Sequence, residues 1–115
     1  MIRLLMFPVA MLALASSATA GNDYPTLDRV MFVENCMRDH ADRPRQEMMY
    51  KCSCALDAIA SQIAYDDFVE LSTALDAGQI AGERGAAVRE SDMGRDMAKR
   101  FRAIRAKAFS GCLIQ

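Results

Sequence analysis

The chain has 115 residues, of which 14 are basic, 15 are acidic and 4 are cysteine, and its formal net charge is −1. A near-neutral charge argues against general nucleic-acid binding, which needs a domain that is basic as a whole. The length is that of one small domain.

Residues 1–20 have the pattern of a secretory signal peptide. One positive charge precedes an apolar run over residues 4–15, and small residues follow, ending in Ala18-Thr19-Ala20. This is the order of a charged start, an apolar middle and an A-x-A cleavage site, and the run is too short to span a membrane. We expect cleavage after Ala20 and a bacterial exported protein, located in the periplasm, with a single helical domain over residues 21–115.

The four cysteines predict two structural disulfides. A domain of this size buries little apolar surface, so packing alone leaves it marginally stable. Export places the chain in an oxidising compartment, where an even number of cysteines is typical of a disulfide framework. All of them follow the predicted cleavage site: Cys36, Cys52, Cys54 and Cys112.

Apolar residues recur every three or four positions through most of the chain, which predicts an all-α fold. The first helix is expected over residues 27–39, with Thr26 as its N-cap. It cannot continue through Pro44, because proline has no amide hydrogen for the helical hydrogen bond. Its apolar stripe comprises Leu27, Val30, Val33 and Met37. The second helix is expected from Arg45 to about Ala64, with apolar positions Met48, Met49, Cys52, Leu56, Ile59 and Ile63.

Two further helices are expected in the second half of the chain. One lies in the segment YDDFVELSTALDAG, with Asp67 and Glu70 at capping-box spacing and Gly78 as its end. Residues 79–91 contain two glycines and no long apolar run, so we expect a loop with room for one short helical turn. Ser91 caps the last helix, which Gly111 ends and whose apolar stripe comprises Met93, Met97, Phe101, Ile104 and Ala108. Four helices joined by short loops predict a small disulfide-stapled bundle.

Helix geometry predicts how the cysteines pair. Cys52 and Cys54 are two positions apart, about 200° around a helix, so they point in nearly opposite directions and do not bond to each other. If the first helix ends near His40, Cys36 lies closer to the level of Cys52 than to that of Cys54. We therefore predict the pairs Cys36–Cys52 and Cys54–Cys112.

The alternative is a soft metal site for copper or zinc. Three cysteines and the only histidine of the chain fall within residues 34–57. Thiolate, imidazole and thioether groups are the ligands that Cu(I) and zinc prefer. The candidate ligands are Cys36, His40, Cys52 and Cys54, with Cys112 and the methionines Met37, Met48 and Met49 nearby. The opposite directions of Cys52 and Cys54 weaken this interpretation, because one helix cannot aim both at one ion.

The sequence predicts a protein that is not an enzyme. It contains no G-x-S-x-G, no H-E-x-x-H and no glycine-rich phosphate loop, and it lacks the C-x-x-C of dithiol redox sites. His40 is expected to be a polar residue at a helix end, and the adjacent Asp66 and Asp67 a solvated helix start. No catalytic residue and no cofactor is therefore predicted.

The C-terminal segment is the candidate binding site. From Met93 to Gln115 there are 6 basic residues and 1 acidic residue, whereas residues 21–92 have 7 basic and 14 acidic ones. We expect the apolar stripe to be buried and the basic outer face to dock on the acidic surface of another exported protein, while contact with anionic lipid is the less favoured possibility. The predicted binding residues are Arg95, Lys99, Arg102 and Arg105, with Arg100 and Lys107 beside them.

The predicted signal peptide, the cysteine in the first helix and the segment YKCSCALD (Tyr50–Asp57) together resemble small exported all-helical proteins of proteobacteria. Some of those are associated with periplasmic quinoprotein dehydrogenase systems. The size and the disulfide-tied helices are also similar to acid-stress chaperones of the HdeA type, which have one disulfide and no C-x-C. The resemblance covers mainly residues 34–57 and assigns no role to any residue. From all of these features together we expect a non-enzymatic periplasmic binding or accessory protein that acts as a chaperone, inhibitor or subunit, and the alternative is a periplasmic copper- or zinc-binding protein.

Overall fold

The computed structural model describes residues 23–115, so the predicted signal peptide lies outside the described residues. Within this range the chain forms a small all-α domain with five helices and no strand, which confirms the predicted class but not the predicted number of helices. None of the helices in this range is both long and apolar enough to cross a membrane. The helices are α1 (Thr26–Asp39), α2 (Arg45–Ala60), α3 (Tyr65–Gly78), α4 (Glu83–Glu90) and α5 (Asp92–Gly111).

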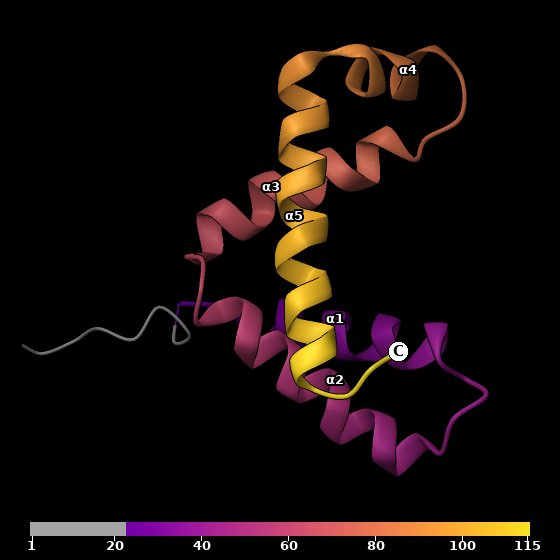
Figure 1. Cartoon of the computed structure of the whole chain (residues 1–115), viewed down its shortest axis with the longest axis vertical. Helices are drawn as coiled ribbons and strands as arrows, with labels where there is room; N and C mark the ends of the chain where they lie inside the picture. The colour runs from indigo at the N-terminus through magenta and orange to yellow at the C-terminus, as the bar shows by residue number, and fades with distance from the viewer. Residues whose placement is uncertain (1–22) are drawn as a thin grey trace, which may run out of the picture.

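The long helix α5 organises the molecule (Figure 1). Its C-terminal half lies on the hairpin of α1 and α2, α3 crosses its middle, and α4 folds back beside its N-terminal end. The main contacts of α1 are with α2. The hairpin and the α3–α4 unit therefore pack at different levels of α5.

Helix α4 occupies the segment that we expected to be a loop. The periodic pattern missed it because α4 has no apolar stripe, and its one buried residue is Gly85. Gly82 precedes it with a φ of 86°, a left-handed conformation that favours glycine. An ideal Cβ on Gly85 would lie 1.6 Å from the carbonyl oxygen of Ile80, so only glycine allows α4 to pack so closely on the preceding turn.

The bounds of α3 and the N-cap of α5 follow the prediction, but the predicted capping box of α3 does not form. The Ser91 hydroxyl accepts a hydrogen bond from the Gly94 amide at 3.0 Å, as an N-cap does. Helix α3 begins at Tyr65, so Asp67 and Glu70 lie inside it and no capping box forms. The Tyr65 amide instead donates to a carboxylate oxygen of Asp23 at 2.9 Å, across a separation of 42 residues.

The core is built around α2 and the inner face of α5, and two predicted stripes are partly wrong. Leu27 and Val30 are 68% and 53% exposed, because α1 packs on α2 through its C-terminal half. On α5, Met93 is 74% exposed, and Met97 and Ile104 are half-buried. The buried residues of α5 are Gly94, Ala98, Phe101 and Ala108. Most of them are small and let α3 and α4 approach closely, whereas the predicted stripe was chosen for large side chains.

Tyr24 anchors the segment before α1 to the rest of the domain. Its hydroxyl donates to the carbonyl of Ile63 at 3.0 Å, and its ring lies edge-on to Tyr65 at 5.4 Å between centroids. Burial raises the pKa of Tyr24 to about 12, and the nearby Asp23 carboxylate contributes to the shift.

We expect Tyr24 to make the domain sensitive to alkali. A group whose pKa is raised on folding stabilises the fold fully below its unfolded value of 10.0, and this contribution is lost as the pH approaches about 12. Tyr24→Phe should cost about 1 kcal/mol near neutral pH, through the lost hydrogen bond, and should reduce the loss of stability in alkali. Urea unfolding at about pH 8 and about pH 11 measures both effects. An equal alkaline loss in both proteins would contradict this assignment.

Candidate functional site: the basic face of the last helix

The four cysteines form the two disulfides that the helix geometry predicts. Cys36 on α1 bonds to Cys52 on α2, and Cys54 on α2 bonds to Cys112, just after α5. Cys52 is completely buried whereas Cys54 is exposed, as expected for residues on opposite sides of one helix. The first bond closes the hairpin and the second ties the end of α5 to it. Two disulfides are compatible with an oxidising compartment.

The structure does not assemble Cys36, His40, Cys52 and Cys54 into a ligand set. All of these sulfurs are in disulfides and are not thiolates. His40 Nδ1 is 2.8 Å from the carbonyl oxygen of Cys36, a hydrogen bond within the end of α1. Between residues 23 and 115, no group of three or more His, Cys, Asp or Glu side chains lies close enough to hold a metal ion. The predicted thioether ligands Met37 and Met48 are buried in the core around the first disulfide.

The predicted basic residues are spread over the outer side of α5. At about 100° per residue, Arg95, Lys99 and Arg102 follow one flank of the helix, whereas Arg100 and Lys107 lie further around it. These residues also differ in the groups that they contact within the domain.

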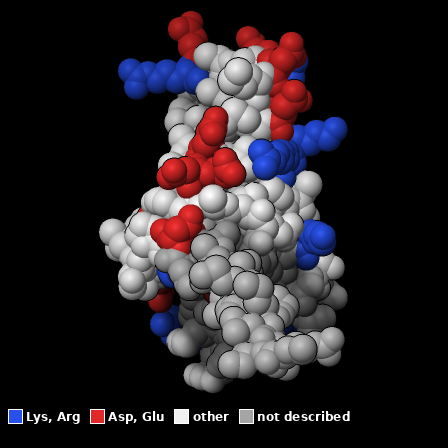
Figure 2. Space-filling model, turned by 90° about the vertical axis from the view of Figure 1, so that its left-hand side faces the viewer, with Lys and Arg blue, Asp and Glu red and all other residues white. Residues whose placement is uncertain are grey.

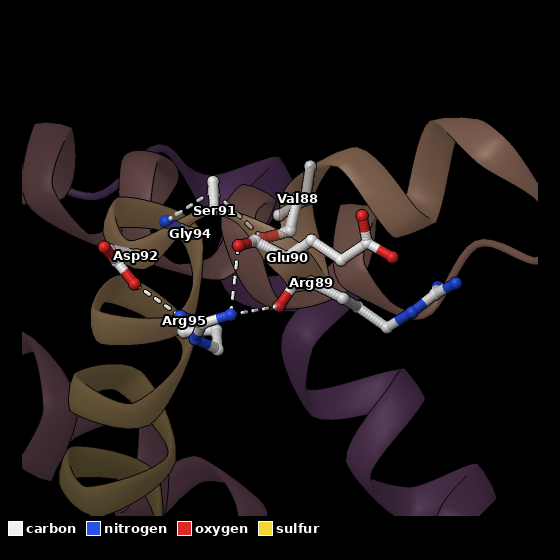
Figure 3. A network of polar contacts seen from close by, with 7 residues as sticks. All are labelled: Val88, Arg89, Glu90, Ser91, Asp92, Gly94 and Arg95. Carbon is white, nitrogen blue, oxygen red and sulfur yellow. Dashed lines mark hydrogen bonds and ion pairs between the residues drawn. The ribbon is translucent and has the colours of Figure 1, made fainter.

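Arg95 is held by the end of α4 (Figure 3). Its Nη1 donates to the carbonyl of Glu90 at 3.0 Å and to that of Arg89 at 3.4 Å, and its Nη2 pairs with Asp92. These carbonyls belong to the last turn of α4, where main-chain acceptors have no partner within the helix. Arg95 therefore stabilises the α4–α5 junction together with the Ser91 cap.

Arg89 stabilises the end of α3 in the same way, through hydrogen bonds to main-chain carbonyls. Its Nη1 donates to the carbonyls of Gly78 and Ile80, both at 2.8 Å. Arginine fits this role because its planar guanidinium offers several donors in a fixed geometry. The sequence carried no signal for either contact, because the position of α4 has to be known first.

Arg105 turns toward α1. Its Nη2 is 4.0 Å from a carboxylate oxygen of Asp39, and its guanidinium carbon is 4.9 Å from the centre of the Phe109 ring. It is one of the residues that line a cleft of about 450 Å³ between α1, α3 and α5. Four phenylalanines line this cleft: Phe32, Phe68, Phe101 and Phe109.

The other basic residues of α5 are exposed and form no ion pair with any residue between 23 and 115. They are Lys99, Arg100, Arg102 and Lys107, here called the unpaired basic face. Elsewhere in this part of the chain, Arg43 and Lys51 both pair with Glu47, at 3.2 and 2.6 Å. On the side of the molecule drawn in Figure 2, acidic side chains gather over the middle and upper part, and basic ones project at its edges. Positive charge is thus concentrated on one helix of an otherwise acidic domain.

No protein-family model matches the sequence, and neither the curated proteins nor the solved structures include one with significant similarity to it.

Proposed function

We propose that this chain is a non-enzymatic periplasmic accessory protein, acting as a chaperone, inhibitor or subunit, that docks through α5 on an acidic surface of another exported protein. The observation that carries the proposal is the unpaired basic face. Four exposed cations without a carboxylate partner in the described part of the chain attract an acidic surface and favour fast association. The periplasmic location rests on the signal-peptide pattern and agrees with the two disulfides.

The structure changes which predicted binding residues are the best to test. Arg95 and Arg105 have partners within the domain, so changing them alters the α4–α5 junction or the contact with α1. Lys99 and Arg102 have no such contacts and remain proposed binding residues. With Arg100 and Lys107 they form the unpaired basic face, which is the proposed docking surface.

Reversal of the charges on the unpaired basic face is expected to weaken partner binding by roughly tenfold or more. The variant carries Lys99→Glu, Arg100→Glu, Arg102→Glu and Lys107→Glu. A partner is first captured from periplasmic extract with the oxidised wild-type protein. Its affinity for purified wild type and variant is then measured by calorimetry at low and high salt.

The control is Arg84→Glu on α4, an exposed cation that also lacks an ion pair among residues 23–115. It should bind like wild type, and circular dichroism should show the same helix content for all three proteins. Equal affinity of wild type and the four-charge variant would remove α5 from the interface.

A further inference from the structure

A second feature of α5 is a half-open groove of about 410 Å³ on the side where α3 and α4 meet it. This volume lies within the roughly 300–1,000 Å³ of typical small-molecule sites. The lining residues come from all three helices: Ala74, Leu75, Gly78, Val88, Arg89, Gly94, Arg95, Ala98, Lys99 and Arg102.

The charged residues that line the groove are basic. Among the described residues, four cations line it and no aspartate or glutamate does, although Asp92 pairs with Arg95 beside it. Hydrogen bonds to main-chain carbonyls hold Arg89 at the end of α3 and Arg95 at the end of α4. Lys99 and Arg102 have no ion pair among the described residues, so their charges are available to a ligand. Such a rim attracts anions and repels cations.

The rest of the lining is apolar and mostly small. Ala74 and Gly78 of α3 and Gly94 and Ala98 of α5 line it, while Leu75 and Val88 add larger apolar side chains. Gly94 lets α4 approach α5 closely, because a Cβ there would lie 2.4 Å from the carbonyl oxygen of Val88. An apolar chain placed there gains about 0.8 kcal/mol for each methylene removed from water.

We propose that this groove binds an anionic amphiphile, namely a free monocarboxylate with an unbranched apolar chain. The carboxylate lies at Lys99 and Arg102, and the chain runs over Ala74, Leu75 and Val88. The two parts of the ligand match the two parts of the groove, a cationic rim beside an apolar floor. This goes beyond the docking function proposed above, because a small molecule rather than a protein occupies the groove.

Titration of the oxidised protein with sodium decanoate, kept below the concentration at which it forms micelles, tests the proposal. We expect saturable binding by calorimetry, with the largest amide shifts in nuclear magnetic resonance spectra at Ala74, Val88 and Ala98. Decyltrimethylammonium, which has the same chain and the opposite charge, should produce no such shifts. The proposal would be wrong if the shifts lay outside the groove or if both surfactants bound equally. It would also be wrong if the protein bound only to decanoate-containing vesicles.

Two pairs of charge substitutions separate the groove from the rest of α5. Lys99→Gln with Arg102→Gln should weaken decanoate binding at least tenfold, whereas Arg100→Gln with Lys107→Gln should leave it unchanged. Both variants lose two charges from the same helix, so a general electrostatic effect would weaken both equally and would contradict the proposal. Unchanged partner docking by the four-charge variant, together with normal decanoate binding by the wild type, would refute only the proposed function.

Filling the groove provides an independent test. An ideal Cβ on Gly78 would lie 3.7 Å from Cγ of Arg89, an ordinary contact, so the position accepts a Cβ atom without a clash. Gly78→Leu should therefore fold with unchanged helix content and abolish decanoate binding. Undiminished binding to the folded variant would show that the ligand lies elsewhere.

Discussion

Replacement of Cys54 and Cys112 by serine is expected to lower the free energy of unfolding by about 4 kcal/mol. Their bond spans 58 residues, and in the chain-entropy model a closed loop of that length removes much of the freedom of the unfolded chain. The bond between Cys36 and Cys52 spans 16 residues and contributes about 3 kcal/mol by the same argument. Small domains have total stabilities of roughly 5–15 kcal/mol, so loss of both bonds should leave most of the protein unfolded.

Urea unfolding of the oxidised wild type and of each double variant measures these losses. Cys36 and Cys52 are better replaced by alanine, because both of their sulfurs are in the core and a buried hydroxyl would add its own energetic cost. Wild-type protein unfolded in the presence of a thiol reductant is the control and should match the variant that lacks both bonds. A stability loss below about 1 kcal/mol for the Cys54–Cys112 pair would show that the unfolded chain is already compact at that contact.

The two bonds should also differ in how easily they are reduced. Cys54 is exposed on α2, whereas Cys52 has no exposed surface and Cys36 is buried with it. Thiol–disulfide exchange requires a thiolate to reach one of the sulfurs. A mild reductant should therefore open the Cys54–Cys112 bond while the Cys36–Cys52 bond persists. The Cys54–Cys112 bond lies at the end of α5 that is far from α4 (Figure 1), so the groove should survive that reduction.

Periodic patterns were sufficient where a helix buries large side chains on one face. They gave the bounds of α1 and α5 almost correctly, although part of each predicted apolar stripe is exposed. They also gave the phase of α2, from which the disulfide pairing follows. Cys52 and Cys54 point to different partners because a helix turns by about 100° per residue, a property of local geometry that needs no knowledge of the fold. Disulfide pairing across a short hairpin was therefore predictable.

The same patterns failed where glycine and alanine make the contacts. Helix α4 packs through Gly85, and the inner face of α5 near α4 is formed by Gly94 and Ala98, which a search for large apolar side chains passes over. Contacts between distant segments were equally hidden, such as the Asp23 carboxylate at the start of α3. The groove depends on both kinds of feature, so the sequence predicted its cations but not its shape.

Gly85→Ala is expected to be among the most damaging single substitutions outside the disulfides. The added Cβ would lie 1.6 Å from the Ile80 carbonyl oxygen and 2.6 Å from Nη1 of Arg89, far inside van der Waals contact. The clash involves main chain, so either α4 or the turn before it must move. That movement breaks the bonds from Arg89 to Gly78 and Ile80, which cap α3. Overpacking of this kind costs typically 1–3 kcal/mol, and the added loss of the cap places the expected value near about 3 kcal/mol.

Gly111→Ala is the matched control for this substitution. Gly111 is the last residue of α5, and an ideal Cβ there meets nothing within 4 Å, so alanine should be neutral or should stabilise the protein by up to about 1 kcal/mol. Urea unfolding compares the two variants, and amide hydrogen exchange locates the damage. In Gly85→Ala, protection should fall in α4 and at the end of α3, while the disulfide-bonded hairpin stays protected. Decanoate binding should fall with it, because Val88 and Arg89 of α4 form one wall of the groove. Equal stability of the two variants would mean that α4 does not pack on the Ile80 carbonyl, and both the groove and its proposed ligand would then be lost.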